Sequence, residues 1–455
     1  MHYALLLVLM AVLWLAGGAS RADVAGQVVT RAAATAALVF ALLFGERPSF
    51  SEHRAVLLFL ICAIALPVLQ LIPMPPALWQ ALPGRDVIAH AAQLAGESQP
   101  WRPVSMVPSA TVNAATSLIV PTAVLLCLSG LRATERPWLL GAVLLLITAS
   151  MLVGLIQFSG SRFPQPLINY TNDVSGTFAN RNHFAVYLAL GCLVLPVWAF
   201  AGRRRPAWRV PVAGGLFLLL VLTILASGSR AGMVAAAIGM VVGPFMIRED
   251  LRRALHGQPR WVLPVVVATL VGVIVVFVLL STMLGRAVSV DRLMAEDVGR
   301  DMRSRGLPTV LAMVTHYFPF GTGLGTFDPM FRLNEPFELL KLTYFNQAHD
   351  DYLGLVLDAG LPGAVAVISA LIWWLWASWT VWLRSSPDRS SNLGAGVATG
   401  RLGSSMLFIM FLASAVDYPV RTPLMMALAT IAACWLAWGA RAHRGSSLPM
   451  VVRSV

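Results

Sequence analysis

The sequence has little charge, and this excludes most soluble folds. Charged residues make up 12% of the 455 residues. Soluble domains carry about 25% charged residues. Hydrophobic residues account for 58% of the chain, and the mean hydropathy is +0.74. The composition therefore predicts an integral membrane protein rather than a soluble domain.

Cysteine is equally scarce, and its positions exclude a metal site built on thiolates. The four cysteines all lie within apolar runs, and no two of them have metal-ligand spacing; they are Cys62, Cys127, Cys192 and Cys434. Buried cysteines of this kind behave as small packing residues. We therefore expect them to be inert.

Long apolar runs predict an all-α polytopic membrane protein of about twelve transmembrane helices. Several runs are shorter than the roughly 20 residues that cross a bilayer, so loop ends or tilt must complete them. The first run lacks a preceding Lys or Arg, so we expect a retained helix rather than a cleaved signal peptide. The runs are 3–17, 32–44, 55–72, 109–130, 137–157, 183–201, 210–226, 231–247, 261–284, 353–382, 402–416 and 423–440.

Arginines are distributed unevenly between alternate loops. If the N-terminus lies inside, the inner loops hold the arginine clusters at 203–209, 248–260 and 384–401, whereas the opposite connections hold scattered single arginines. The positive-inside rule then places residues 285–350 outside. The net charge of +12 is mostly a topology signal, because the basic residues are split among separate loops and do not form a nucleic-acid surface.

Three regions follow from this topology. Residues 1–284 form transmembrane helices 1–9, residues 285–352 form an outer loop domain that carries catalytic residues, and residues 353–455 form transmembrane helices 10–12 with an inner tail. Residues 73–108, rich in Pro and Trp, predict a second outward loop with a short interfacial helix and tryptophan anchors.

Three arginines in two separated segments are candidate ligands for a diphosphate. Arg230 follows Ser227-Gly228-Ser229 in a turn of small residues that lets a ligand approach closely, and Arg303 and Arg305 lie in the outer loop. The planar guanidinium binds phosphate oxygens in a bidentate manner. In the alternative interpretation, each of these arginines lies at a helix boundary and its side chain extends to the membrane interface.

His349 is the candidate general base, because an imidazole titrates near neutrality. Asp350 and Asp351 follow it directly before an apolar helix. They either cap the first turn of that helix or orient the imidazole. The sequence leaves both roles open.

Two further segments are candidates for ligand binding. Asn180, Arg181 and Asn182 offer donors for sugar or phosphate, although helix capping alone would explain either asparagine. Residues 319–327 resemble a phosphate-binding glycine loop, but they lack the Lys-Ser/Thr ending of a P-loop. We therefore expect these glycines to form a compact turn.

The ordered set of these motifs resembles the bacterial O-antigen ligase/polymerase family. The set consists of residues 176–185, the Ser-Gly-Ser-Arg turn, the glycine run, and His349 with Gly360 eleven residues on. The likeness covers about residues 170–365. It implies a GT-C-like architecture, with His349 as the family's loop histidine and Arg230 and Arg303 as its arginines. Arg305 is the rival of Arg303, and Asp350 stands where many members have Asn.

This resemblance implies a multi-pass protein of the bacterial inner membrane whose active site faces the periplasm. The implied donor is an undecaprenyl-diphosphate-linked glycan, and the acceptor is lipid A-core for a ligase or a second glycan for a polymerase. Membrane lipids are the other partners, and nucleic acid is not one. We favour the ligase, because the Arg/Arg/His set is most closely associated with it.

The chemistry of the residues agrees with this implication. No ATP or nucleotide sugar is available outside the membrane, so the donor must already be activated. Fixed arginines can neutralise a diphosphate leaving group without a metal or a cofactor, and attack from the opposite face would invert the anomeric carbon. The alternatives are a polysaccharide polymerase, a protein O-oligosaccharyltransferase, a lipid-linked glycan transporter and a membrane scaffold. A transporter predicts ionisable residues at the midplane, whereas here they concentrate at loop edges.

Overall fold

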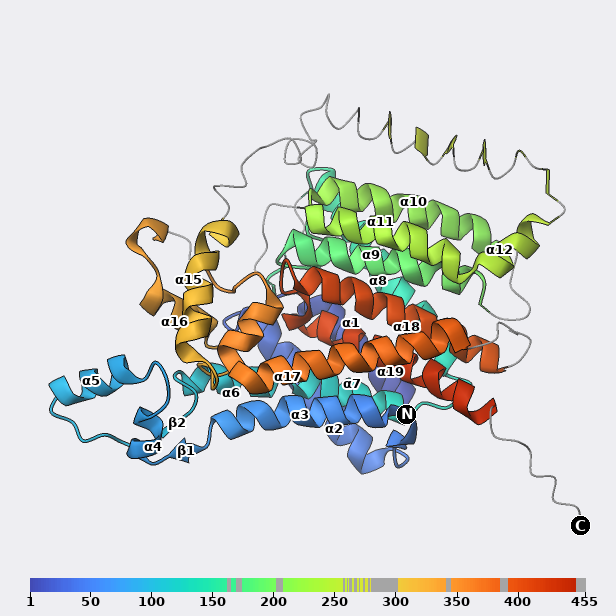
Figure 1. The fold of residues 1–455 in the computed structure, drawn as a ribbon. Coiled ribbons are helices and arrows are strands. Elements are labelled where there is room, and N and C mark those ends of the chain that lie inside the picture. The colour runs from blue at the N-terminus through green and yellow to red at the C-terminus, as the bar shows by residue number, and fades with distance from the viewer. Residues whose placement is uncertain are drawn as a thin grey trace, which may run out of the picture.

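The computed structural model of the chain is almost entirely helical (Figure 1). It describes residues 1–161, 165–168, 174–201, 208–256, 302–340, 345–384 and 392–446, with scattered positions between 258 and 279. The helices, in chain order, are α1 (His2–Ala16), α2 (Ala25–Phe44), η1 (Phe50–His53), α3 (Arg54–Gln70), α4 (Pro76–Gln80), α5 (Asp86–Leu94), α6 (Pro108–Ser117), α7 (Ile119–Ser129), α8 (Arg136–Phe158), α9 (Arg181–Ala199), α10 (Arg209–Ser227), α11 (Arg230–Met246), α12 (Arg248–Leu255), α15 (Met302–Tyr317), α16 (Phe327–Asn334), η3 (Phe337–Leu339), α17 (Asp351–Trp379), η4 (Thr380–Arg384), α18 (Asn392–Ser414), η5 (Pro419–Arg421) and α19 (Pro423–Ser446).

The helices confirm the predicted all-α membrane fold. Within the described ranges, nine helices are long and apolar enough to cross a membrane, and the pair α11 and α12, bent by 66°, would make ten. Most of the predicted span 261–284 and the loop residues 285–301 lie outside the described residues. The count of twelve and the three-region division therefore stay predictions.

Helices α9 and α19 form the centre of the bundle. In each of them 83% of the most apolar window is buried. Helix α19 packs closely on α18 because glycines face each other: a Cβ built on Gly400 would lie 2.8 Å from Gly439 Cα. Small residues at such interfaces let two membrane helices approach and gain van der Waals contact.

The two ends of the bundle differ in character (Figure 1). One end, here called the hairpin end, carries α4, α5, α15 and α16, and there Gln70 Nε2 donates to Asp358 O at 3.0 Å. The opposite end joins the loops around residues 46–52 and 129–136, where Arg136 pairs with Glu52 at 2.6 Å. We call it the arginine-rich end, because Arg132, Arg136 and the arginines of α12 lie there (Figure 1).

A short hairpin at the hairpin end corrects the predicted role of one tryptophan. Strands β1 (Pro73–Met74) and β2 (Arg102–Pro103) pair antiparallel and bracket α4 and α5. Trp79 is buried beneath Arg102, and its indole N–H donates to Pro103 O at 2.9 Å. Trp79 therefore holds the hairpin together and does not anchor it in the membrane. Trp101, by contrast, is 64% exposed.

The hairpin is joined to the glycine run by the buried Arg85. Its guanidinium donates to Pro83 O, Val104 O and Gly321 O at 2.8 to 2.9 Å. Burial lowers the pKa of Arg85 to about 10. Three carbonyl oxygens compensate for the missing carboxylate, so this arginine is a structural link between two outer segments.

Candidate functional site

His349 occupies a backbone conformation that is unusual for its residue type. Its φ is +52°, and among the described residues it is the one non-glycine residue with a positive φ. The left-handed region costs an L-residue on the order of 1 kcal/mol. Such residues persist where the surroundings hold them, often at functional sites. His349 directly precedes Asp350, the N-cap residue of α17, so its position is set by the start of that helix.

The two predicted aspartates have separate roles. Asp350 Oδ1 accepts the backbone N–H of Tyr352 at 2.9 Å and of Leu353 at 3.1 Å, so it caps α17. Asp351 pairs with Arg421. The capping alternative therefore accounts for Asp350, while a further contact of either aspartate with substrate stays a prediction.

The imidazole of His349 is oriented by Asp417, a residue 68 positions further along the chain. His349 Nδ1 lies 3.2 Å from Asp417 Oδ1, and the carboxylate is buried in the turn between α18 and η5. A carboxylate only accepts, so His349 Nδ1 carries the proton. His349 Nε2 is then the nitrogen with a free lone pair. This is the arrangement that a general base requires.

Asp417 is held in turn by the first turn of α9. Asn182 Nδ2 donates to Asp417 Oδ2 at 2.9 Å, and His183 Nε2 lies 3.5 Å from Asp417 Oδ1. The ring of Tyr418 stands 5.0 Å from each imidazole. We call His183, Asn182, His349, Asp417 and Tyr418 the Asp417 cluster. It joins three segments that are far apart in the sequence.

The other polar residues of that α9 turn were also candidates. Asn180 caps the helix, because its side chain accepts from Asn182 N at 2.8 Å. Capping therefore explains Asn180, as one of the two alternatives expected. Arg181 is half-buried and belongs to the same turn. Asn182 bonds Asp417 directly, and Asn180 Nδ2 lies 3.5 Å from His183 Nε2 of the Asp417 cluster.

Arg230 begins α11 beside this turn. Ser229 caps α11 by accepting Gly232 N at 3.0 Å, and Gly228 closes α10 with a φ of +68°. A Cβ built on Gly232 would lie 2.2 Å from Ala185 Cβ, so the first turns of α11 and α9 are in close contact. Arg230 is exposed. The small residues of the Ser-Gly-Ser-Arg turn thus place this guanidinium at the same end of α9 as the Asp417 cluster.

Helix α15 distinguishes the two rival arginines. Gly306 packs against Phe345, which lies 5.2 Å from the ring of His349, measured between ring centroids. Position 303 is one turn earlier and shares this helix face; its side chain lies outside the described residues. Arg305 Nη2 instead donates to Glu338 O at 2.8 Å, at an exposed position. Arg305 is therefore engaged within the protein, and the choice of Arg303 for the site stays a prediction.

Four consecutive amides of the glycine run, at residues 322–325, already bond within the protein. Thr322 N donates to Leu357 O, Gly323 N to Asp358 O and Leu324 N to the Gln70 side chain, each at 2.8 to 3.0 Å. Gly325 N donates to Asp358 Oδ2 at 3.0 Å. The run forms a compact turn, as expected, and it pairs with the kink in α17.

The kink itself requires a glycine. Gly360 has a φ of +58° and a ψ of −140°, and a Cβ there would lie 1.9 Å from Pro319 O. Leu361 N donates to that same carbonyl at 2.8 Å. The glycine eleven residues after His349 therefore lets the glycine run dock against α17 and fixes the start of the helix.

Arg421 approaches the site from η5. Its Nε donates to Asp351 Oδ1 and its Nη1 to Gln347 Oε1, both at 2.6 Å. Burial works to lower the pKa of Arg421, whereas the carboxylates of Asp351 and Asp358 raise it, and the net direction is upward. This guanidinium stays charged and is engaged within the protein.

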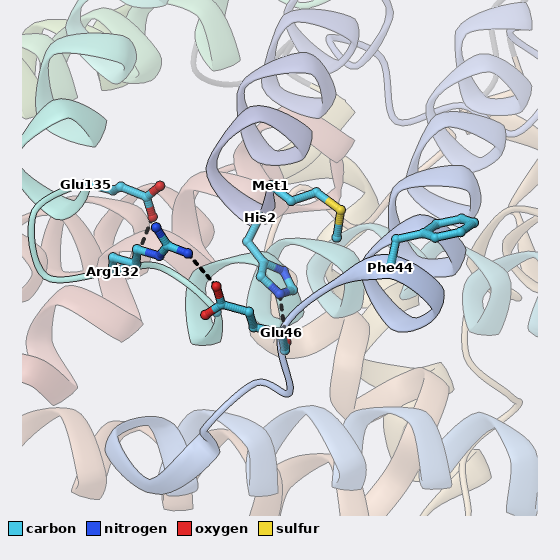
Figure 2. A pocket seen from close by; sticks show the side chains of 7 residues that line it. Met1, His2, Phe44, Glu46, Arg132 and Glu135 are labelled. Carbon is cyan, nitrogen blue, oxygen red and sulfur yellow. Dashed lines mark hydrogen bonds and ion pairs between the residues drawn. The ribbon is translucent and has the colours of Figure 1, made fainter.

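A pocket at the arginine-rich end is a different structure (Figure 2). It has a volume of about 230 Å³, below the roughly 300–1,000 Å³ of typical ligand pockets. Several of its polar groups bond one another: His2 Nε2 bonds Glu46 O at 2.9 Å, Arg132 N donates to Glu135 at 2.9 Å, and the Arg132 guanidinium pairs with Glu46. It ties the N-terminus to two loops and contains no member of the Asp417 cluster.

Asp417 and Arg421 were not among the predicted site residues. The sequence signal that could have identified Asp417 and Arg421 is their position. Each is an ionisable residue in a short turn between two apolar spans, where a buried charge requires a partner. In the part of the chain that the structure describes, no group of three His, Cys, Asp or Glu side chains has the arrangement of a metal site. Transfer without a metal stays a prediction.

Comparison with known proteins agrees with the motifs. A family model described as O-antigen ligase matches residues 215–368, which include Arg230, Arg303 and His349. No curated protein sequence matches the chain. The match covers the glycine run, the kink at Gly360 and the segment that presents the histidine. Over residues 215–368, this membrane protein is similar to the O-antigen ligase family.

Proposed function

We propose that the protein transfers a glycan from an undecaprenyl-diphosphate-linked donor to a hydroxyl of lipid A-core, at the periplasmic face of the bacterial inner membrane. The observation that carries the proposal is the bond between His349 Nδ1 and the buried Asp417, which leaves His349 Nε2 free to accept a proton. The match to the O-antigen ligase family supports glycan transfer as the reaction class.

The proposed reaction is a single displacement at the anomeric carbon. The acceptor oxygen forms a bond to that carbon while the bond from the carbon to the diphosphate oxygen breaks. The hydroxyl proton passes to His349 Nε2, and the electron pair of the broken bond leaves with the lipid diphosphate. Attack from the face opposite the leaving group inverts the configuration.

Two arginines neutralise the leaving group in this scheme. In the proposal, Arg230 acts from the first turn of α11 and Arg303 acts from the start of α15. Each guanidinium stabilises charge that develops on the diphosphate, which is worth most where water is partly excluded. Neither role requires a metal or another cofactor.

The decisive experiment reconstitutes the purified protein with the lipid-linked glycan, with and without lipid A-core, and resolves products by size. We expect a core-dependent shift and a loss of about 100-fold or more in kcat for His349→Ala. His90→Ala is the matched control, because His90 is an exposed residue of α5. A core-independent ladder would indicate a polymerase. Full activity of His349→Ala would overturn the assignment of the base.

A further inference from the structure

Arg421 bridges the chain on both sides of His349. Its Nε bonds Asp351, two residues after the histidine, and its Nη1 bonds Gln347, two residues before it, both at 2.6 Å. One rigid guanidinium thus holds both ends of a five-residue segment. We infer that Arg421 is a positioning residue that fixes the direction of the His349 imidazole. The inference rests on the proposed function.

The backbone of His349 explains why such a bridge is needed. With a φ of +52°, the histidine sits in a region that L-residues leave unless surrounding contacts hold them. Asp350, between His349 and Asp351, caps α17 and fixes the downstream side. The upstream side has no regular element, because Gln347 lies outside any helix. Its bond to Arg421 supplies the missing constraint.

The turn at 417–421 controls the histidine in two ways. Asp417 accepts from the imidazole Nδ1 at 3.2 Å and fixes its tautomer, while Arg421, four residues on, fixes the backbone that carries it. Both residues belong to one short turn that ends in η5. The same turn therefore fixes both the imidazole ring and the backbone of His349, and the direction of Nε2 depends on both contacts.

The contacts of Arg421 distinguish positioning from donor binding. Two of its nitrogens already bond Asp351 and Gln347, and Gly354 stands against the third, since a Cβ there would lie 2.8 Å from Arg421 Nη2. Arg230 is exposed at a helix start. We therefore expect changes at Arg421 to lower kcat, and changes at Arg230 to raise the KM for the donor.

Arg421→Lys tests the inference, because one ammonium cannot bond Gln347 and Asp351 in the geometry of the guanidinium fork. We expect kcat to fall at least tenfold while the KM for the lipid-linked donor stays within twofold, measured by initial rates per folded molecule. A raised donor KM with unchanged kcat would make Arg421 a substrate ligand. Wild-type kcat would also overturn the inference.

Gly354→Ala provides a second, milder variant should Arg421→Lys fail to fold. It pushes a methyl group into the guanidinium, so we expect a several-fold loss of kcat. Gly215→Ala is its control: it is also a helical glycine, and a Cβ there meets nothing within 4 Å. Equal kcat for the two variants would refute the positioning role.

The failure of this inference and that of the proposed function give different results. If His349→Ala keeps full activity, the proposed catalytic role of His349 fails whatever Arg421 does. If His349→Ala is inactive while Arg421→Lys and Gly354→Ala have wild-type kcat, only the positioning role fails.

Discussion

At the scale of single residues, the protonation of one imidazole nitrogen decides what the other can do. Asp417 Oδ1 accepts from His349 Nδ1, and Asp417 itself accepts from Asn182 and from Tyr418 N. The carboxylate is therefore held on several sides. The tautomer with a free Nε2 follows from this arrangement.

Replacement of Asp417 by asparagine tests that dependence. The amide of Asp417→Asn can donate to His349 Nδ1, which would place the proton on Nε2 and remove the base. We expect kcat to fall about 100-fold, with a small change in the donor KM, in initial-rate measurements. Asp328→Asn is the control, because Asp328 pairs with Arg332 on the surface of α16. Equal rates for both variants would contradict the role of Asp417.

The sequence predicted the candidate reactive residues more readily than the residues that hold them. His349 and Arg230 stand in recognisable motifs at the edges of apolar spans, so they could be chosen from residue type and position. The contacts of Asp417 and Arg421 could not be predicted, because they join distant positions. Asp417 lies 68 residues after His349, and Arg421 lies 70 residues after Asp351 and 74 after Gln347. No local pattern encodes such a pairing.

At the scale of the element, α15 carries both rival arginines, Arg303 and Arg305. Gly306 packs toward Phe345, and position 303 lies one turn earlier on that face, whereas Arg305 bonds Glu338 O. A hydrogen bond to a charged group contributes about 1.5–3 kcal/mol. We expect Arg303→Ala to raise the donor KM by about 10-fold or more and Arg305→Ala to leave it within twofold. Donor-dependent rates measure both, and the reverse order would make Arg305 the ligand.

The glycine run shows what a short motif can and cannot predict. Its composition matches either a phosphate cradle or a compact turn, and the missing Lys-Ser/Thr ending favoured the turn. The structure confirms the turn, because amides of the run bond Leu357, Asp358 and Gln70. Those partners come from α3 and α17. The sequence of the run alone could not identify them.

At the scale of the whole molecule, the membrane fold follows from apolar run length, and the arrangement of the helices does not. Runs of apolar residues predicted the spans, because a bilayer imposes a minimum helix length. They did not predict that α9 and α19 would be central, since their burial depends on small residues that meet across helices. The burial of Trp79 likewise depends on the pairing of β1 with β2, 28 residues apart between Met74 and Arg102.

The orientation of the molecule in the membrane gives a final prediction. If the arginine-rich end faces the cytoplasm, α5 projects into the periplasm and α12 lies inside. Leu94 is 77% exposed on α5, and the Arg253 side chain is 67% exposed on α12. We expect Leu94→Cys to react with a membrane-impermeant maleimide in intact spheroplasts, and Arg253→Cys to react only after permeabilisation.

The wild-type chain supplies the background for this labelling. Cys127, Cys192 and Cys434 are buried, and Cys62 is exposed only on the apolar helix α3, where the bilayer would shield it from a polar reagent. Wild-type protein should therefore stay unlabelled in intact spheroplasts. Labelling of Arg253→Cys without permeabilisation, with Leu94→Cys protected, would show that the bundle has the opposite orientation in the membrane. The Asp417 cluster would then face the cytoplasm, where a donor presented in the periplasm cannot reach it.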